Sequence, residues 1–336
     1  MREKQVGSRE SGVGILLCAA AVVSGCGRYA DFKLPAPSGT STSLQFRWQA
    51  RPAPVLEHGT AGDWDSHDAL NPSVVLFHGT YLNLYSGFDG KTWSTGLATS
   101  SDGILWQKQG RVLAPDPATW EGEYMAANGA AIADGARLLY FYEGGRIPRI
   151  GLATSSDGRT WQRHDAPVVD LGPRGSWDER AVADPYVIRA GGKLYMFYLG
   201  QDRARQQRLG VAVSDDGVVW TKLRSNPILE PGGFGAFDEN GVGEPAVWDA
   251  NGYWWMLYTG RARNEVRRLG LARSKDGVHW EKLKDVFEGD QAWDSKVICD
   301  PTVLPSSEGL RVWFGGGDVA HPAENIHGQV GFAILK

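Results

Sequence analysis

Cysteine is scarce in this sequence, which has three cysteines among its 336 residues. Cys18 and Cys26 lie near the N-terminus and Cys299 is far from both, so the chain does not supply a framework of disulfide bonds. Cys299 also has no activating base close to it in the sequence. We therefore interpret Cys299 as a small buried apolar residue rather than a nucleophile.

An excess of charge of one sign is also missing. Lys and Arg number 35, Asp and Glu number 39, and the two kinds are interspersed, which gives a formal net charge of -4. Because nucleic-acid binding needs a basic stripe, this pattern excludes a nucleic acid as the partner. We expect a monomer that has no cofactor and acts on a small or neutral polymer.

Long hydrophobic runs are absent as well. The apolar run from Val13 to Val23 is too short to span a bilayer, and it follows the basic residues Arg2, Lys4 and Arg9. This order of basic and apolar residues is typical of a targeting segment. An ordinary secretory peptide is one interpretation of it.

The end of this run favours another interpretation. Val23-Ser24-Gly25-Cys26 resembles the bacterial lipobox, whose cysteine is acylated and becomes the mature N-terminus. The resemblance implies a signal peptide over 1–25, a lipid on Cys26 and contact with the membrane through this anchor alone. Gly27 follows the cysteine in place of an aspartate, which favours the outer membrane of the cell envelope. Residues 26–43, rich in Pro, Ser, Thr and Gly, are expected to form a flexible tether.

Helical periodicity is absent too, and the chain instead contains one segment written five times. Each copy has an aromatic-acidic pair, followed seven residues later, or eight in the Trp120 copy, by a polar or acidic residue that usually precedes proline. The copies start at Trp64-Asp65, Trp120-Glu121, Trp177-Asp178, Phe237-Asp238 and Trp293-Asp294. Self-similarity at roughly 50 to 60 residues is typical of a solenoid or a propeller.

Each copy contains strand-like segments separated by glycine-rich turns. Alternating aromatic-rich runs such as 193–200 and 253–260 predict strands in hairpins, and Asp-Gly turns such as Asp276-Gly277 lead to a tryptophan. The fifth copy lacks its last strand, and the segment from Phe46 to Glu57 has the right register to supply it. We predict an all-β fold, a single domain over 44–336 with five four-stranded blades, closed by the N-terminal strand.

The innermost strands of a propeller line its axis, so the residues that open them should converge. These residues differ between copies: Asn71, Asn128, Asp184, Glu244 and Asp300. The acidic residue of each aromatic-acidic pair recurs in every copy, and we interpret it as a structural hydrogen-bond acceptor. The variable, convergent positions are the better candidates for function.

At these positions the chain resembles the five-bladed glycoside hydrolases, especially family 43, with families 32, 68 and 130 as relatives. The resemblance implies that a glutamate acid opens the fourth blade and that an aspartate modulating this acid opens the third. Gly243-Glu244-Pro245 and Ala183-Asp184-Pro185 match those two places. Asn71-Pro72 stands where the family has its aspartate base, so this chain departs from the pattern there.

Hydrolysis with inversion needs one protonated and one ionised carboxyl group. We expect Glu244 to be the acid and Asp184 to raise the pKa of Glu244 by like-charge repulsion. Because an asparagine cannot be a base, Asp68 or Asp300 is expected to replace it. The expected substrate is an oligosaccharide or polysaccharide, and Asn71 and Asn128 are expected to bind it.

Two other functions stay open. His67, Arg180 and Lys296 each follow an aromatic anchor by three residues, and they are candidates for substrate binding at the pocket rim. Cations there would suit phosphorolysis, as in family 130, or a uronate substrate. A glycan-binding protein without catalysis is the competing class.

Several aromatic, histidine and arginine side chains complete the set of candidates. Trp93 or Phe234 could stack on a sugar. His321 or His327 could hold a structural ion in the channel, although we predict no catalytic metal. The arginines that follow the second strands, at 203, 205, 261 and 263, are interpreted as a solvated rim.

Overall fold

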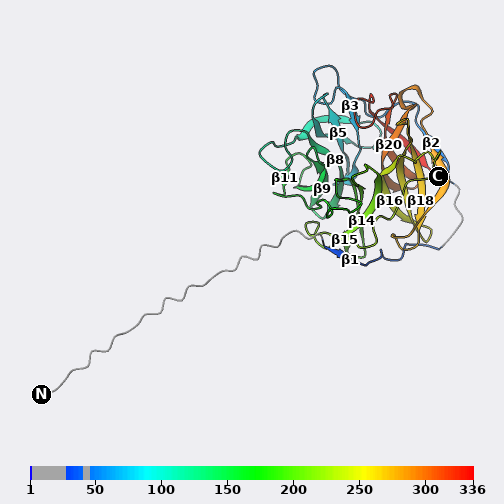
Figure 1. Ribbon diagram of the computed structural model, residues 1–336. Helices are drawn as coiled ribbons and strands as arrows, with labels where there is room; N and C mark the ends of the chain where they lie inside the picture. The colour runs from blue at the N-terminus through cyan, green and yellow to red at the C-terminus, as the bar shows by residue number, and fades with distance from the viewer. Residues whose placement is uncertain (2–27, 41–45) are drawn as a thin grey trace.

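The aromatic-rich runs of each repeat form antiparallel strands in the computed structural model of the chain (Figure 1). The structure describes Met1, residues 28–40 and residues 46–336. The targeting segment and Cys26 lie outside these residues. Within them, the only helical element is one 3-10 turn, η1 (Ala292–Asp294), and no helix is long and apolar enough to cross a bilayer. The prediction of an all-β fold is confirmed.

The strands follow the sequence repeats in order. Repeat 1 contains β3 (Asp68–Leu70), β4 (Val74–Phe77), β5 (Thr80–Phe88), β6 (Trp93–Ser100) and β7 (Gln107–Leu113). Repeat 2 contains β8 (Met125–Asp134), β9 (Arg137–Gly144), β10 (Arg149–Ser155) and β11 (Gln162–Arg163). Repeat 3 contains β12 (Ala181–Ala190), β13 (Lys193–Gln201), β14 (Gln207–Ser214) and β15 (Thr221–Leu223).

Repeats 4 and 5 continue the same order. Repeat 4 contains β16 (Gly241–Ala250), β17 (Tyr253–Arg261), β18 (Arg267–Ser274) and β19 (Trp280–Phe287). Repeat 5 contains β20 (Val297–Ser306), β21 (Gly309–Gly317) and β22 (Gln329–Leu335). Two short strands precede repeat 1, β1 (Tyr29–Ala30) and β2 (Trp48–Ala50). β2 pairs antiparallel with β22, with Trp48 opposite Leu335.

The outer strand of most repeats is fixed by an ion pair to a buried acidic residue. In repeat 3, Lys222 donates to Asp178 at 2.6 Å, and the Tyr198 hydroxyl donates to the same carboxylate at 3.3 Å. Repeats 1, 2 and 4 pair the equivalent acids with Lys108, Arg163 and Lys282. The acidic residues of the aromatic-acidic pairs are therefore structural acceptors, as predicted.

The Asp-Gly turns are structural as well. In repeat 2, the Asp157 carboxylate accepts the backbone N–H groups of Arg159 and Thr160 at 2.8 Å, and Trp161 donates through Nε1 to the carbonyl of Gly158 at 3.0 Å. Gly158 has a φ of +73°, a conformation that glycine adopts without steric cost. In repeats 2, 3 and 4 the turn thereby positions its tryptophan, and Trp220 and Trp280 pack against Phe141 and Phe197 of the preceding repeat.

The prediction that 26–43 is a flexible tether is wrong for residues 28–40. This segment lies along repeats 3 and 4, where β1 pairs in parallel with β15 and Leu34 is buried in the core (Figure 1). The backbone N–H of Leu34 donates to the carbonyl of Asp276 at 2.9 Å. Its proline- and serine-rich composition indicates little helix or sheet, but it does not prevent docking through backbone hydrogen bonds and one buried leucine.

Candidate active site

The five residues that open the first strands share an unusual backbone conformation. Their φ angles are positive, between +47° and +52°, although none of them is glycine: Asn71, Asn128, Asp184, Glu244 and Asp300. In repeats 2 to 5 the antiparallel register shifts at this residue, and in repeat 1 it separates β3 from β4. Asn and Asp tolerate the left-handed region better than most residues, whereas Glu244 gains no such advantage there. Strain of this kind is typical of functional sites.

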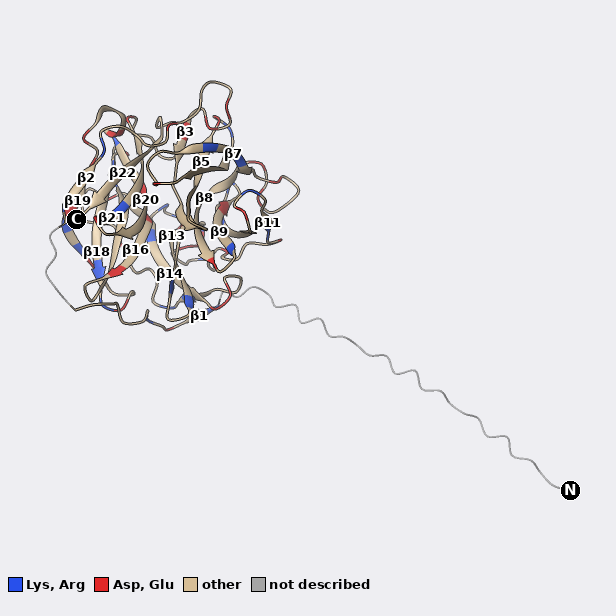
Figure 2. Cartoon of the chain, turned by 180° about the vertical axis from the view of Figure 1, so that it is seen from behind, with Lys and Arg blue, Asp and Glu red and all other residues tan. Residues whose placement is uncertain are grey.

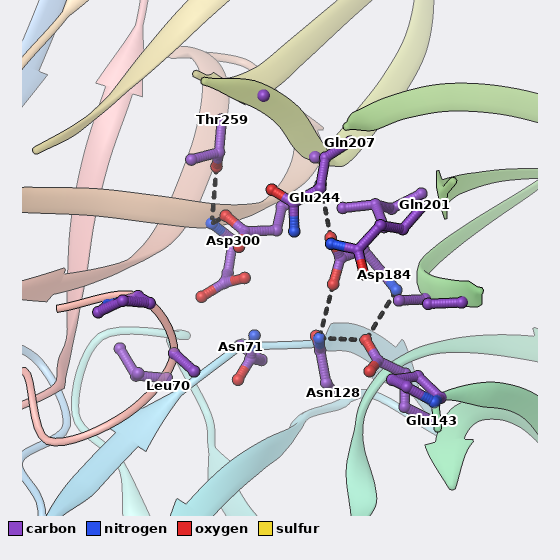
Figure 3. Close-up of a pocket in the computed structure, with 18 of the residues that line it drawn as sticks. Leu70, Asn71, Asn128, Glu143, Asp184, Gln201, Gln207, Glu244, Thr259 and Asp300 are labelled. Carbon is purple, nitrogen blue, oxygen red and sulfur yellow. Dashed lines mark hydrogen bonds between the residues drawn. The ribbon is translucent and has the colours of Figure 1, made fainter. Parts of the chain in front are cut away.

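The irregularity brings all five side chains to one place, as the sequence predicts. They line a pocket of about 290 Å³ and a smaller space of about 30 Å³ that is enclosed by the same five residues and those that follow them (Figure 3). The smaller space is the size of about one water molecule. The larger one is in the range of small-ligand pockets.

A ladder of hydrogen bonds holds the acidic members together. Asp184 accepts the backbone N–H of Glu244 at 3.2 Å, and Glu244 in turn accepts the backbone N–H of Asp300 at 3.1 Å. Asn128 donates to the Asp184 carboxylate at 2.7 Å. Each carboxylate therefore fixes the backbone of the next repeat, so the spacing between the acids is set by the packing of the repeats.

Sequence reasoning missed a fourth acid of the pocket, Glu143 in β9. Its carboxylate is buried and accepts the N–H of Asp184 at 2.7 Å and a proton of the Asn128 amide (Figure 3). A signal was available, because the residue between the aromatic and the glycine of each second strand varies. It is Ser86, Glu143, Leu199, Thr259 and Gly315 in the five repeats. The rule that variable repeat positions carry function applies to these residues too.

Burial and mutual repulsion change the acidity of three of these groups. Desolvation, followed by repulsion from Glu244, raises the pKa of Asp184 to about 6. The same two causes raise the pKa of Asp300 well above its usual range. For Glu143 the causes are desolvation and then repulsion from Asp184, and its pKa also rises well above its usual range. Buried carboxyl groups that keep a proton near neutral pH are able to act as acids.

The pocket walls carry aromatic and basic groups. In repeat 1, Trp93 lines the pocket and stacks on Phe88 with ring centroids 4.8 Å apart. Repeat 2 adds Tyr124, whose hydroxyl donates to Glu324 at 2.9 Å; its pKa rises to about 12 through burial and this hydrogen bond. Phe234, the other sequence candidate for stacking, does not line the pocket and is exposed. Of the two stacking candidates, Trp93 is thus the one that lines the pocket.

The cations of the pocket differ from those predicted. Arg261 and Arg267, from adjacent strands of repeat 4, line the pocket, so Arg261 is not part of a solvated rim. Desolvation lowers the pKa of Arg261. Arg267 is buried and donates to the carbonyls of His321 and Pro322 at 2.9 and 2.7 Å. These two hydrogen bonds hold the connection between β21 and β22 at the pocket, where Pro322, Ala323 and Glu324 line the wall.

Three candidates for substrate binding lie elsewhere. Arg180 and Lys296 are exposed and do not line the pocket. His67 is also exposed, and its ring bonds to the side chain of Asn325 at 2.9 Å. Each of the three lies immediately before a first strand, at the exposed outer end of the connection that leads to it, so the spacing of three residues from the aromatic anchor does not reach the pocket.

Asp68 also has a different role from the one expected. Its carboxylate is fully buried and accepts the backbone N–H groups of Asn325, Ile326 and Gly328 at 2.6, 3.0 and 2.8 Å. It is not among the residues lining the pocket. With three donors occupying its oxygens, Asp68 fixes the connection between β21 and β22 and is not placed to act as a base. The two histidines of that connection, His321 and His327, are exposed and do not line the channel.

One group of side chains has the donor atoms of a metal site. Ligand atoms of Glu244, Cys299 and Asp300 lie within 4.8 Å of one another. Cys299 is buried, as predicted, and its thiol donates to Asp300 at 2.9 Å. Burial raises the pKa of this thiol well above its usual range. In this arrangement the thiol is a hydrogen-bond donor to its neighbouring carboxyl group.

The sequence matches one family model twice. The model of the glycosyl hydrolases family 32 N-terminal domain matches residues 74–209 and residues 154–299, an overlap that reflects the internal repeats. An uncharacterized protein of Mycobacterium tuberculosis is 25% identical over 231 residues, 63% of this chain and 75% of the relative. The 1,2-beta-oligomannan phosphorylase of a Thermoanaerobacter species is 27% identical over 305 residues, 84% of this chain and 95% of the phosphorylase.

Solved structures share the architecture. One of them is described as belonging to the family 130 mannoside phosphorylases, which contain glycoside hydrolases that target beta-1,2 mannosidic linkages in Candida mannan. It superposes with a TM-score of 0.68 at 18% identity, covering 88% of this chain and 96% of that one. At this identity the likeness supports the propeller fold and not an activity.

Proposed function

Since the chain belongs to the propeller superfamily of glycoside hydrolases that the family 32 N-terminal domain represents, we propose that it cleaves glycosidic bonds of an oligosaccharide or polysaccharide. The observation that carries the proposal is the gathering of four carboxyl groups, three of them with raised pKa, in one pocket with an aromatic wall. Cleavage of a glycosidic bond needs one carboxyl group that gives a proton and one that is ionised.

Glu244 gives a proton to the leaving oxygen, and Asp300, whose carboxyl oxygen lies within 4.8 Å of that of Glu244, gives its own proton to Glu244 in turn. Burial keeps the proton on Asp300, which also has a carboxylate oxygen, Oδ1, without a hydrogen-bond partner. A base must be ionised, so this environment argues against Asp300 as the base. Glu244, the acid expected from the sequence, is the more exposed member of the pair, which supports its role as the group that contacts the leaving oxygen.

Asp184 takes the ionised role. With a pKa of about 6 it is mostly ionised at neutral pH, and it is able to accept a proton from the attacking water. The bond from the sugar carbon to the leaving oxygen breaks as the water oxygen bonds to that carbon. Glu143 and Asn128 hold Asp184 in place from the other side. Asn71, at the edge of the pocket, is proposed to bind a sugar hydroxyl.

Phosphorolysis is a second candidate, because a specific observation favours it. Arg261 and Arg267 place two guanidinium groups in the pocket, and phosphate binds well to such groups. Phosphate would replace water as the nucleophile and remove the need for a base. One relative, which matches 84% of this chain, is a 1,2-beta-oligomannan phosphorylase.

Two structural expectations belong to the same proposal. We infer that the five repeats are five blades and that β2 closes the ring, which the pairing of Trp48 with Leu335 supports. We also propose that the chain is lipid-anchored through Cys26 to the cell envelope, which the targeting segment and the lipobox resemblance support.

The experiment is release of reducing ends from a panel of glycans by residues 27–336, with and without phosphate. Glu244→Gln and Asp300→Asn are the test variants, and Asp215→Asn, which removes an exposed carboxylate at an Asp-Gly turn, is the matched control. Release that Asp215→Asn retains and both test variants lose supports the proposal. Glycan binding without release by any chain would support the non-catalytic alternative.

A further inference from the structure

The pocket lies at one end of the propeller, and the N-terminal segment docks at the other end. The first strand of each repeat starts at the pocket, as β16 does with Gly241 and Glu244, and ends in a hairpin turn, here Asn251-Gly252. Because a strand rises about 3.3 Å per residue, Ala250 lies roughly 20 Å from Glu244 along the axis. We call the end that carries the hairpin turns and the Asp-Gly turns the turn face.

Residues 28–40 are docked along the turn face. Lys33 pairs with Asp276 of an Asp-Gly turn at 2.8 Å. Trp254 donates through Nε1 to the carbonyl of Pro35 at 2.9 Å, and the Gly252 N–H donates to the carbonyl of Ser38 at 2.6 Å. These partners belong to the turns of repeat 4 or to the strand beside them. The segment therefore does not approach the pocket.

The first docked residue lies close to the turn face as well. The carbonyl of Arg28 accepts the N–H of Lys222 at 2.8 Å, and the carbonyl of Ala30 accepts that of Arg224 at 2.9 Å. Lys222 follows the Asp216-Gly217 turn by a few residues, in β15. Cys26 is separated from Arg28 by Gly27 alone, so the chain between the two Cα atoms spans at most about 7 Å.

A lipid on Cys26 would then be held within a short distance of the turn face. The pocket lies roughly 20 Å farther along the axis, which is more than the chain between Cys26 and Arg28 allows. We propose that the turn face rests on the lipid surface and that the pocket faces away from it, toward polymeric glycan. This inference rests on lipidation of Cys26 and is independent of catalysis.

The chemistry of the turn face suits a lipid surface. Large apolar side chains are exposed at the tips of its Asp-Gly turns, at Leu105 in repeat 1 and at Val218 and Val219 in repeat 3. Val218 and Val219 lie beside β15, next to the place where Arg28 docks. Apolar side chains at the membrane interface add to the binding of a single acyl anchor, which by itself holds a protein only weakly.

The test uses the full chain, produced in a bacterium with its own N-terminal segment and reconstituted in vesicles of phosphatidylethanolamine and phosphatidylglycerol. A fluorophore is attached to one introduced cysteine at a time, because Cys299 is buried. Leu105→Cys and Val219→Cys report on the turn face. Ile147→Cys and Phe234→Cys report on the opposite end, which we call the pocket face: Ile147 precedes Pro148, which lines the pocket, and the Phe234 ring lies against Arg263, two residues after the pocket residue Arg261. All four native side chains are exposed. The vesicles carry lipids with a nitroxide quencher on the headgroup.

The expected result is loss of most of the fluorescence at 105 and 219 and little loss at 147 and 234. A linker of 20 Gly and Ser residues inserted between Gly27 and Arg28 has a root-mean-square length of about 25 Å, so it should abolish the difference between the faces. Cys26→Ser should abolish quenching at all four positions. Equal quenching of both faces at the native spacing, stronger quenching of the pocket face, or a pattern unchanged in Cys26→Ser would each overturn the proposal.

Discussion

Removal of Lys222 tests whether the buried ion pairs fix the outer strands. In repeat 3 the Lys222 ammonium bonds to Asp178 at 2.6 Å and to the carbonyl of Asp170 at 2.7 Å. The side chains of Lys222 and Asp178 are only 7% and 0% exposed. Lys222→Met keeps most of the side-chain volume but leaves the Asp178 carboxylate buried without its cation.

The cost follows from this burial. Breaking a buried ion pair on one side destabilises a protein by about 3–5 kcal/mol. The entropy of unfolding is about 2.1 cal/mol/K per residue, or roughly 0.6 kcal/mol/K for a domain of about 300 residues, so Lys222→Met should lower Tm by roughly 5–8 °C. The equivalent Lys282 and Lys108 are 27% and 34% exposed, and their replacement by Met should cost less.

Thermal and urea unfolding of the three variants measures this order. Lys222→Met combined with Asp178→Asn removes the stranded charge as well, so the double variant should be more stable than Lys222→Met alone. A Tm for Lys222→Met within about 2 °C of the native value, or equal effects of all three lysine replacements, would refute the reasoning.

Three further predictions concern the pocket. Activity should rise with pH through a midpoint near 6 as Asp184 ionises, and a profile of kcat/KM that is flat between pH 5 and 7 would contradict its role as base. Ionisation of Asp184 should also lower the free energy of unfolding, because its pKa in the folded protein, about 6, lies above its value in the unfolded chain. A stabilisation of up to roughly 3 kcal/mol is present below pH 4 and is lost as pH rises through 6. Urea unfolding of the native chain and of Asp184→Asn at several pH values measures this loss. Arg261→Gln should reduce activity or its response to phosphate by about tenfold or more, whereas Arg263→Gln, whose native side chain is 67% exposed, should match the native enzyme in the same assay.

Repetition made the fold predictable from the sequence. Five copies of one pattern identify the strands and turns, and the positions where the copies differ identify Asp184, Glu244 and Asp300 as neighbours. Contacts between repeats join residues that are far apart in the sequence, and the predictions missed the pocket residues that depend on such contacts. Glu143 reaches the pocket from a second strand, Arg267 from a third, and neither lies in the motif that marks the first strands.

Two errors have a common physical origin. Asp68 is close in sequence to the pocket residue Asn71, but successive side chains of a strand point to opposite faces, so Asp68 points away from the pocket. Its carboxylate instead accepts backbone N–H groups of the connection between β21 and β22. Residues 28–40 have the composition of a linker, yet one buried leucine and a few backbone hydrogen bonds suffice to dock them. In both cases the partner lies more than 190 residues away along the chain, beyond the reach of local patterns.

The measurement that tests the central claim most directly is release of reducing sugar from a glycan panel by the native chain and Glu244→Gln, with and without phosphate. We predict release by the native chain and loss of at least about a hundredfold in Glu244→Gln, the size expected for removal of a general acid. Full release by Glu244→Gln, or no release from any glycan by the native chain, would contradict the proposed chemistry of the pocket.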